Sequence, residues 1–331
     1  MLIGGLSRSG KTLLASMVGS HSRIAIPAAG SHLWAYFHGR NGDLADDANL
    51  ERAISTLLRY RYVAALEPDA RRIRAEAAAG PRTYGHLFGL FLAHYAEAHG
   101  KLRWGEHTSL VEAHADRVFE AFPDARVIHM VRDPRDRHSA ALKLYPRGRG
   151  QVGGATAWWR YSTALGGRHA QRYPDAYRIV RYEDLARAPE ETVRDVCAFI
   201  GEAYEPAMLA MGEAPAYAER LRRSSGDRPG LVSTDHIGRY RGVIPDADIA
   251  FIEAHVGALM ERLGYALDHP RATRLARIRR AFLGQPGQTA RFLAASTVAH
   301  LQGRSPWVVR RTVGARALEG GRRGGTMGGA A

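Results

Sequence analysis

The sequence predicts an α/β protein, a three-layer sandwich in which helices cover both faces of a central, mostly parallel sheet. Short apolar strands alternate along the chain with longer segments of helical periodicity. A glycine-rich loop follows the first strand directly, and an Arg-Asp-Pro-Arg block follows the second. Because helices separate successive strands, neighbouring strands are expected to run parallel.

The expected elements follow in chain order. Strands are expected at 2–6, 126–131 and 177–181, which are short and rich in apolar residues. Helices are expected at 10–20, 44–66, 83–98, 155–173, 189–200 and 245–263, and another opens at Pro134. Gly201 and Gly264 end two of these helices. Ligands bind beyond the carboxyl ends of the strands in such sheets, so we expect the site there.

The formal net charge of the 331-residue chain is +14, and it is unevenly distributed. Residues 271–331 contain twelve arginines and one acid, Glu319, whereas the preceding part is close to neutral. We therefore expect a globular domain at 1–268 and a basic tail at 269–331, with a disordered Gly/Arg-rich end. This asymmetry argues against reading the whole chain as a nucleic-acid-binding protein.

The sequence also predicts a cytoplasmic location. No apolar stretch is long enough to span a bilayer, and the first residues lack an apolar core of signal-peptide length. The single cysteine, Cys197, cannot form an internal disulfide.

The loop from Gly5 to Thr12 matches the phosphate-loop pattern, in which two glycines separated by four residues precede Lys-Thr. Glycines let the backbone curl so that its N–H groups point inward, and the following helix adds its positive N-terminal end. The pattern therefore predicts a site for a phosphate-like anion but does not identify that anion.

The second strand does not end as it would in a nucleoside triphosphatase. Such an enzyme needs an acidic residue there to hold magnesium. Here Arg132 occupies the strand end, and Asp133 is followed at once by Pro134 and Arg135. We therefore expect a second anion-binding group at this position and no metal site.

Five segments, in order, resemble motifs of the sulfotransferases that use 3′-phosphoadenosine 5′-phosphosulfate (PAPS). Residues 8–14 resemble the 5′-phosphosulfate loop, and residues 127–136 resemble the 3′-phosphate motif, a strand followed by Arg-Asp-Pro-Arg. Residues 122–126, 180–185 and 238–242 are similar to three further blocks of that family. The resemblance covers about residues 1–268 and implies the P-loop-NTPase-like sulfotransferase fold.

The resemblance implies that PAPS is a co-substrate and that no metal takes part. It places Arg8 at the bridging and transferring groups of the phosphosulfate. The 5′-phosphate would be cradled by the loop backbone, at Ser9, Gly10, Lys11, Thr12 and Leu13. Arg8 and Lys11 would then stabilise charge on the leaving phosphate.

The resemblance also assigns residues to the nucleotide's other end. Arg132 would bind the 3′-phosphate together with a serine hydroxyl, Ser139. Tyr182 would lie near the adenine, and Arg239 or Arg241 would close over the 3′-phosphate.

The chain departs from the family pattern at three points. Lys11 stands where the family usually has threonine, and Ser139 comes one residue earlier than the family serine. The segment 26–32 contains no carboxylate where relatives often carry a candidate base.

The identity of the general base therefore stays open, with three candidate residues. His32 lies where the missing carboxylate would be. Glu106 and His107 lie in a segment that relatives write Trp-Gly-Asp/Glu-Lys-Thr-Pro. A histidine titrates near neutrality and suits base chemistry.

The implied activity is transfer of a sulfuryl group from PAPS to a hydroxyl or amine, on a small-molecule, glycan or lipid-linked acceptor that the motifs do not identify. Two alternatives stay open. Gly10-Lys11-Thr12 also suits a P-loop ATP-dependent small-molecule kinase. The missing acid and the displaced serine would suit a noncatalytic sulfonucleotide-binding relative.

The tail between residues 271 and 303 combines arginines with apolar residues at helical spacing. Leu275, Ile278 and Phe282 fall on one face, and arginines fill much of the rest. This pattern predicts a basic amphipathic helix on an anionic membrane surface, at the inner face of the membrane. The alternative is that the tail helices pack on the domain and leave the arginines solvated. Nucleic-acid binding is disfavoured because aromatic residues for base stacking are sparse.

We expect the full chain to co-sediment with anionic vesicles at low salt and a chain ending at His269 to stay in the supernatant. Each basic residue near such a surface contributes roughly 1 kcal/mol, and salt weakens the attraction. Equal solubility of the two chains with vesicles at low salt would show that the tail does not bind membranes.

Overall fold

The computed structural model describes residues 1–142, 151–211, 232–269 and 283–302. Its central sheet has the strand order β4-β1-β5-β6. These strands are β4 (Glu106–His107), β1 (Leu2–Gly4), β5 (Val127–Val131) and β6 (Tyr177–Arg181). All three pairings are parallel, as the alternation of strands and helices predicts. At the edge, β2 (Ile24–Ala25) pairs in parallel with β3 (Arg103–Trp104).

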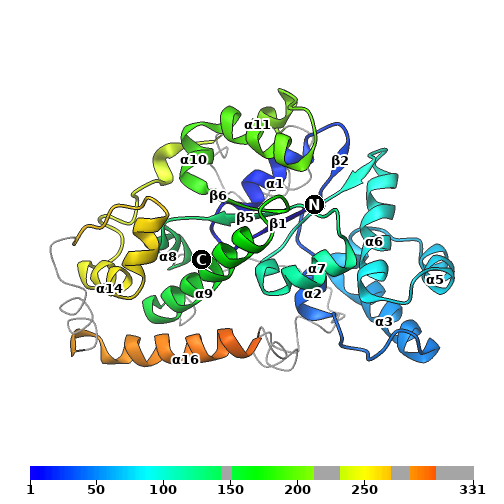
Figure 1. The fold of residues 1–331 in the computed structure, drawn as a ribbon, viewed down its shortest axis with the longest axis horizontal. Coiled ribbons are helices and arrows are strands. Elements are labelled where there is room, and N and C mark those ends of the chain that lie inside the picture. Colours follow the sequence, from blue (N-terminus) through cyan, green and yellow to red (C-terminus); the bar gives the residue numbers. More distant parts are fainter. Residues whose placement is uncertain (143–150, 212–231, 270–282, 303–331) are drawn as a thin grey trace, which may run out of the picture.

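Helices cover both faces of the sheet and make the predicted three layers (Figure 1). One layer contains α1 (Lys11–Gly19), α10 (Tyr182–Arg187) and α11 (Pro189–Ile200). The other contains the short 3₁₀ helix η1 (Val111–His114), α7 (Ala115–Ala121), which follows it directly, and the long α9 (Val152–Arg172).

The inner strand β5 is buried on both faces, which a parallel sheet requires. Its side chains alternate between the two layers. Ile128 and Met130 join the core cluster that contains Leu14 of α1 and Val196 of α11. His129 points the other way and meets Gly166 on α9, where an added Cβ would collide with its ring.

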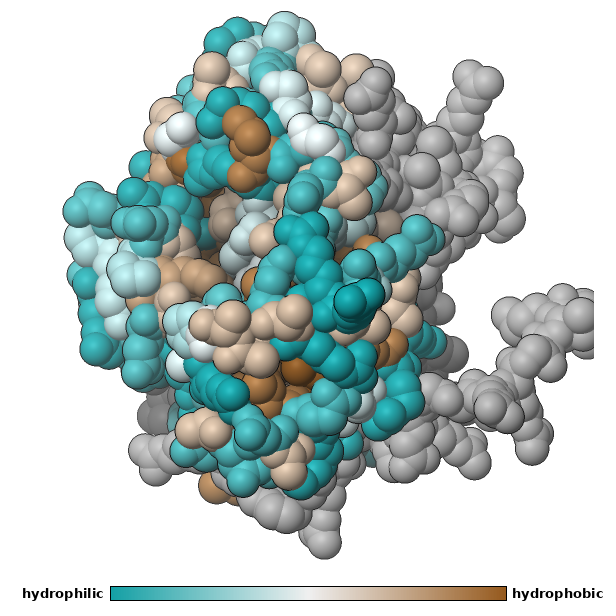
Figure 2. All heavy atoms as spheres, turned by 90° about the vertical axis from the view of Figure 1, so that its right-hand side faces the viewer, coloured by the Kyte–Doolittle hydropathy of each residue, from teal (hydrophilic) through white to brown (hydrophobic). Residues whose placement is uncertain are grey.

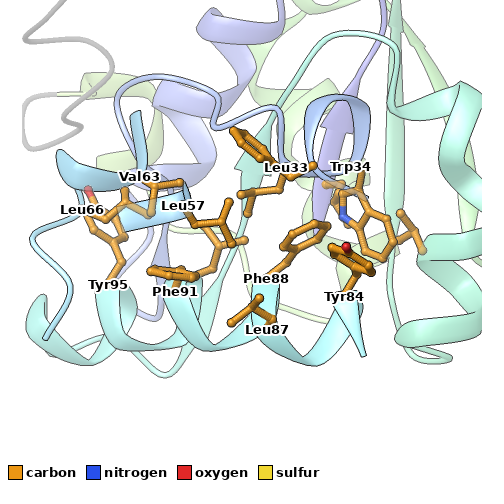
Figure 3. Packing of buried hydrophobic residues seen from close by; sticks show 14 of the residues in the cluster. Leu33, Trp34, Leu57, Val63, Leu66, Tyr84, Leu87, Phe88, Phe91 and Tyr95 are labelled. Carbon is orange, nitrogen blue, oxygen red and sulfur yellow. The ribbon is translucent and has the colours of Figure 1, made fainter. Parts of the chain in front are cut away.

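A helical region is inserted between β2 and β3. It comprises α2 (Leu33–Tyr36), α3 (Asp47–Arg59), α4 (Arg61–Ala64), α5 (Ala70–Ala79) and α6 (Tyr84–Ala98). Asp46, Asp69 and Thr83 cap the helices that follow them by accepting backbone N–H groups. Figure 3 shows its core, in which aromatic side chains of α6, including Phe88 and Phe91, meet Trp34 and Leu57. The outer surface of this side of the molecule is mostly hydrophilic (Figure 2).

The remaining described elements lie mainly beyond the carboxyl ends of the strands and along one edge. They are α8 (Pro134–Leu142), α12 (Ala207–Ala210), the 3₁₀ helix η2 (Thr234–His236), α14 (Asp246–Arg262) and α16 (Pro286–Gln302). Figure 1 shows α8 and α14 beyond the strand ends and α16 running along the edge of the molecule below α9.

Several element boundaries differ from those that the sequence predicts. The first strand ends at Gly4 rather than residue 6, because Gly5 has φ +106° and begins the loop. The helix expected at 44–66 starts at Asp47 and is broken at Tyr60, whose backbone is extended. The helix expected at 155–173 begins earlier, at Val152. The two-residue strands β2, β3 and β4 are too short to show an alternating pattern.

Part of the predicted basic tail forms α16, which packs against α9 and α14. Its Phe292 is buried, with the ring centroid 4.4 Å from that of His255 and 4.8 Å from the guanidinium carbon of Arg160. The predicted amphipathic face of Leu275, Ile278 and Phe282 lies outside the described residues. Among the described helices, none combines the length and apolar character needed to cross a bilayer.

We expect Phe292→Ala to lower the free energy of unfolding by about 3 kcal/mol, because a buried aromatic side chain is lost and a cavity remains. The neighbouring Leu293 is 54% exposed. Leu293→Ala is therefore the matched control and should change stability by less than about 0.5 kcal/mol. Denaturant unfolding measures both variants, and equal losses would contradict docking of α16 through Phe292.

Candidate functional site

The phosphate loop lies where sequence and topology place it, after the central strand β1 and before α1. Two of its glycines are required by geometry. Gly5 and Gly10 have φ values of +106° and +91°, and an added Cβ would collide with the Met130 carbonyl oxygen at Gly5. At Gly10 it would lie 2.7 Å from the ring of Tyr182. Arg8 also lies in the left-handed region, with φ +70°. The loop therefore curls tightly ahead of the positive end of α1, as an anion site requires.

Lys11 is the first residue of α1 and is buried beneath the loop. Its Nζ donates to the Gly5 carbonyl oxygen and to Ser109 Oγ, each at 2.6 Å. Burial lowers the pKa of Lys11 to about 7, Glu112 opposes this shift, and Arg137 adds to it. The ammonium group thus bridges the loop and the segment after β4.

Arg132 directly follows β5 and lies beside the loop. Its guanidinium donates to the Arg8 carbonyl oxygen at 3.3 Å and to the His236 carbonyl oxygen at 2.6 Å. The guanidinium carbon lies 4.5 Å from the ring centroid of Tyr182, which also contacts Gly10. The Nε atom is buried and has no hydrogen-bond partner among the described residues. Arg132 and Tyr182 are therefore brought together with the loop, and Arg132 retains one unsatisfied donor.

The rest of the Arg-Asp-Pro-Arg block serves the fold. Both carboxylate oxygens of Asp133 accept hydrogen bonds from Arg135, which also pairs with Glu253 at 2.7 Å. Asp133 is thus committed to an ion pair. Within the described residues, no group of three or more His, Cys, Asp or Glu side chains is placed to hold a metal ion.

Asp136 connects the block to the loop that contains Arg239 and Arg241. Its carboxylate accepts the backbone N–H groups of Gly238 at 2.7 Å and Tyr240 at 2.9 Å. This contact and the Arg132–His236 bond hold residues 236–240 against the ends of β5 and α8.

The other residues expected at the 3′-phosphate have protein partners in this structure. Arg241 donates to Asp268 at 2.7 Å, and Arg239 lies 3.4 Å from the His236 ring nitrogen. Ser139 Oγ donates to the Asp136 carbonyl oxygen at 2.9 Å, within its own helix. Their expected roles at the 3′-phosphate stay predictions.

The three candidate bases lie around the carboxyl end of β4, which pairs with β1. Glu106 is buried, and its Oε1 accepts from the backbone N–H groups of Ser31 at 2.9 Å and His32 at 3.1 Å, and from the Ser31 hydroxyl. Its Oε2 is buried without a hydrogen-bond partner among the described residues. His32 Nδ1 lies 2.9 Å from Thr108 Oγ1, and His107 Nε2 lies 3.1 Å from the Ala28 carbonyl oxygen.

The surroundings set the charge state of these three side chains. Burial, with added repulsion from Lys11 and His107, lowers the pKa of His32 to about 4. Burial likewise lowers the pKa of His107 to about 4. Burial raises the pKa of Glu106, against the hydrogen bonds from Ser31 and His32. Both histidines are therefore neutral at pH 7 and able to accept a proton.

Sequence reasoning missed several residues of this site. Ser109 accepts a hydrogen bond from Lys11, and Thr108 contacts His32. Glu112 lies fully buried under the loop. The signal that could have found them is their position just after Glu106-His107, but so short a strand does not show in the sequence. The sequence places Asp136 in the segment that resembles the 3′-phosphate motif but predicts no separate role for it.

Comparison with known proteins agrees with this geometry. The profile of the sulfotransferase family matches residues 1–206. The chain belongs to the sulfotransferase family.

The chain is similar to a mouse (Mus musculus) protein, carbohydrate sulfotransferase 5. It is 28% identical over 173 aligned positions, and the alignment covers 44% of this chain and 42% of that protein. This chain thus spans less than half the length of the curated relative that it matches.

Two solved sulfotransferase domains share the fold. The domain of the Synechococcus PCC 7002 olefin synthase superposes with a TM-score of 0.56 at 19% identity, covering 80% of this chain and 94% of that one. The domain from the curacin biosynthetic pathway gives a TM-score of 0.52 at 17% identity, with 80% and 97% covered. The predicted P-loop-like α/β fold of the sulfotransferases is therefore confirmed.

We expect Arg132→Ala to weaken binding of 3′,5′-adenosine bisphosphate by at least about 2 kcal/mol, the approximate worth of a charge-assisted contact. Binding of adenosine 5′-phosphate, which lacks the 3′-phosphate, should hardly change. Calorimetric titration of both nucleotides measures the difference. Equal losses for the two ligands would show that Arg132 does not read the 3′-phosphate.

Proposed function

We propose that the protein transfers a sulfuryl group from PAPS to a hydroxyl or amine. The observation that carries this proposal is the position of Arg132. It places an unsatisfied, buried guanidinium donor beside a phosphate loop, with Tyr182 in contact with both. Two anion sites flanking an aromatic ring suit a nucleotide that has phosphate groups at both its 5′ and 3′ positions. Family membership supports the same donor.

The residues fit the charge changes of this reaction. The acceptor oxygen forms a bond to sulfur as the bond from sulfur to the 5′-phosphate oxygen breaks, and the electron pair leaves with the phosphate. Cations and backbone N–H groups around the loop stabilise that charge. Lys11 and Arg8 supply the cations, and Gly10 allows the backbone to curl around the leaving group.

We assign the general base to His32. When His32 donates from Nδ1 to Thr108 Oγ1, its Nε2 carries the lone pair that accepts the acceptor's proton. Glu106 then acts as a positioning residue, because its carboxylate holds the Ser31 and His32 N–H groups and fixes the left-handed backbone of His32. The Ala28 contact of His107 supports a structural role for that residue.

A carbohydrate hydroxyl is the acceptor class that the observations favour. The mouse relative is named as a carbohydrate sulfotransferase. Next to His32, the aromatic rings of Tyr36 and Tyr62 lie with centroids 5.1 Å and 6.3 Å from the imidazole. Aromatic faces provide rigid, amphipathic contact area, which suits the apolar face of a sugar ring.

We also propose a cytoplasmic location, with the basic tail at the inner membrane face. This proposal is based on the charge pattern of residues 271–331.

One titration series distinguishes this function from its alternatives. The protein should bind 3′,5′-adenosine bisphosphate without magnesium and bind ATP with magnesium much more weakly. Turnover of labelled PAPS that persists in a chelator supports the sulfotransferase. Preference for ATP with magnesium, with turnover lost in chelator and restored by magnesium, would support the kinase. Tight bisphosphate binding without turnover on any acceptor would indicate a noncatalytic relative.

We expect kcat/KM of the wild-type enzyme to rise with pH through about 4 and to fall through about 7. The rising limb is loss of the proton from His32, and the falling limb is loss of the proton from Lys11 in the free enzyme. His32→Gln should lower kcat by about 10²–10³-fold and remove the rising limb, with bisphosphate affinity unchanged.

The matched control is His38→Gln. Burial lowers the pKa of His38 to about 4 as well, but the ring stacks on Trp34, with centroids 5.6 Å apart. This variant should keep the rising limb. A rising limb that persists in His32→Gln would move the base assignment to Glu106 or His107.

A further inference from the structure

Glu112 is a fully buried carboxylate directly beneath the phosphate loop. It lies on η1, and its Oε2 accepts the backbone N–H of Gly5 at 3.3 Å. The close approach depends on Gly4, where an added Cβ would collide with Val111 and lie 3.5 Å from Glu112 Oε2. The chain is therefore built to bring this carboxylate against the start of the loop.

A buried polar network holds the carboxylate in place. Ser162 of α9 donates to its Oε1, and Ser162 Oγ lies 3.2 Å from His129 Nε2. His129 Nδ1 in turn lies 2.8 Å from the Tyr177 hydroxyl, and His169 Nε2 lies 2.9 Å from the Glu112 carbonyl oxygen. The network joins η1, α9, β5 and β6 beneath the loop.

Gly5 is shared between Glu112 and Lys11. Its N–H donates to Glu112, and its carbonyl oxygen accepts from Lys11 Nζ at 2.6 Å. The buried Glu112 carboxylate and the buried Lys11 ammonium group therefore bind the two peptide groups on either side of Gly5. Removing either charge leaves the other buried and less compensated.

The other titratable side chains around this pair are mostly neutral at pH 7. They are His32, His107 and His129, Tyr161 and His169 of α9, Tyr177 of β6 and Arg137 of α8. Burial lowers the pKa of each histidine and raises the pKa of both tyrosines. Arg137, whose Nε donates to the Ser7 carbonyl oxygen, adds positive charge. Among these surrounding groups, none opposes the effect of Arg137 on Lys11 as Glu112 does.

We propose that Glu112 is a positioning residue for the donor site, which sets the shape of the phosphate loop and keeps Lys11 charged before the donor binds. This inference rests on the proposed function, because it assigns Lys11 to the leaving phosphate. Glu112 acts on the donor site through Gly5, at the start of the loop, and through Lys11.

The consequence appears in the pH dependence of binding. The bisphosphate needs the charged form of Lys11, so affinity falls as pH rises through the pKa of Lys11, which is about 7 in the wild type. Without the Glu112 charge that pKa is lower, and affinity falls at a lower pH. Loss of a nearby opposite charge lowers the pKa of a buried amine by about one pH unit or more. A purely structural role would weaken binding equally at every pH.

The experiment is calorimetric titration of wild type and Glu112→Gln with 3′,5′-adenosine bisphosphate between pH 5.5 and 9, limits chosen to bracket a pKa of about 7. Glutamine keeps the size and one acceptor oxygen but removes the charge. We expect the pH at which affinity falls to decrease by about one unit or more. In a Lys11→Met background, Glu112→Gln should no longer move the profile. An unchanged profile in Glu112→Gln would overturn the proposal.

Two further measurements serve if Glu112→Gln does not fold. Glu112→Asp keeps the charge and should retain the wild-type profile, whereas Ser162→Ala should weaken binding evenly across pH. Wild type alone should take up protons on binding at pH 8 and hardly any at pH 6, measured in buffers of different ionisation enthalpy. No uptake at either pH would overturn the proposal. Failure of the wild type to bind the bisphosphate at all would instead reject the proposed function.

Discussion

The structure depends on the turn of the backbone at Gly5. The strand β1 must end there, because φ is +106° and a side chain would meet the carbonyl oxygen of Met130. The turn is fixed on one side by Glu112 and on the other by Lys11, which also begins α1. The end of β1, the curl of the loop and the start of α1 are thus fixed within a few residues of one another. The neighbouring strand ends at Glu106-His107 and Arg132 are then placed around the loop by the parallel pairing of β4 and β5 with β1.

The Arg-Asp-Pro-Arg block shows how one short motif divides its tasks. Arg132 faces the site with an unsatisfied donor. Asp133 and Arg135 form a buried ion pair that ties the strand end to Glu253 of α14. Asp136 holds the backbone of residues 238–240. Because a buried charge is costly without its partner, loss of one member would disturb the packing as well as the site.

Much of the fold could be predicted from the sequence, because its long elements carry strong periodic signals. The strands at 127–131 and 177–181 and the helix at 189–200 are observed essentially where expected. The phosphate loop and Arg132 could be predicted because their chemistry needs fixed residue types at fixed spacing. Glu112, Ser109 and Thr108 could not, since their roles depend on a two-residue strand and on contacts across the chain. The buried ion pair between Arg135 and Glu253 was also invisible, because the two residues lie 118 positions apart in sequence.

The helical region between β2 and β3 has a consequence for how such proteins diversify. Residues 24–25 and 103–104 pair directly, so the chain leaves the sheet and returns to it at neighbouring points. The insertion packs largely around its own aromatic core (Figure 3), whereas the helices nearest the phosphate loop belong to a different core. Substitutions within this core can therefore accumulate with little effect on the packing around the phosphate loop.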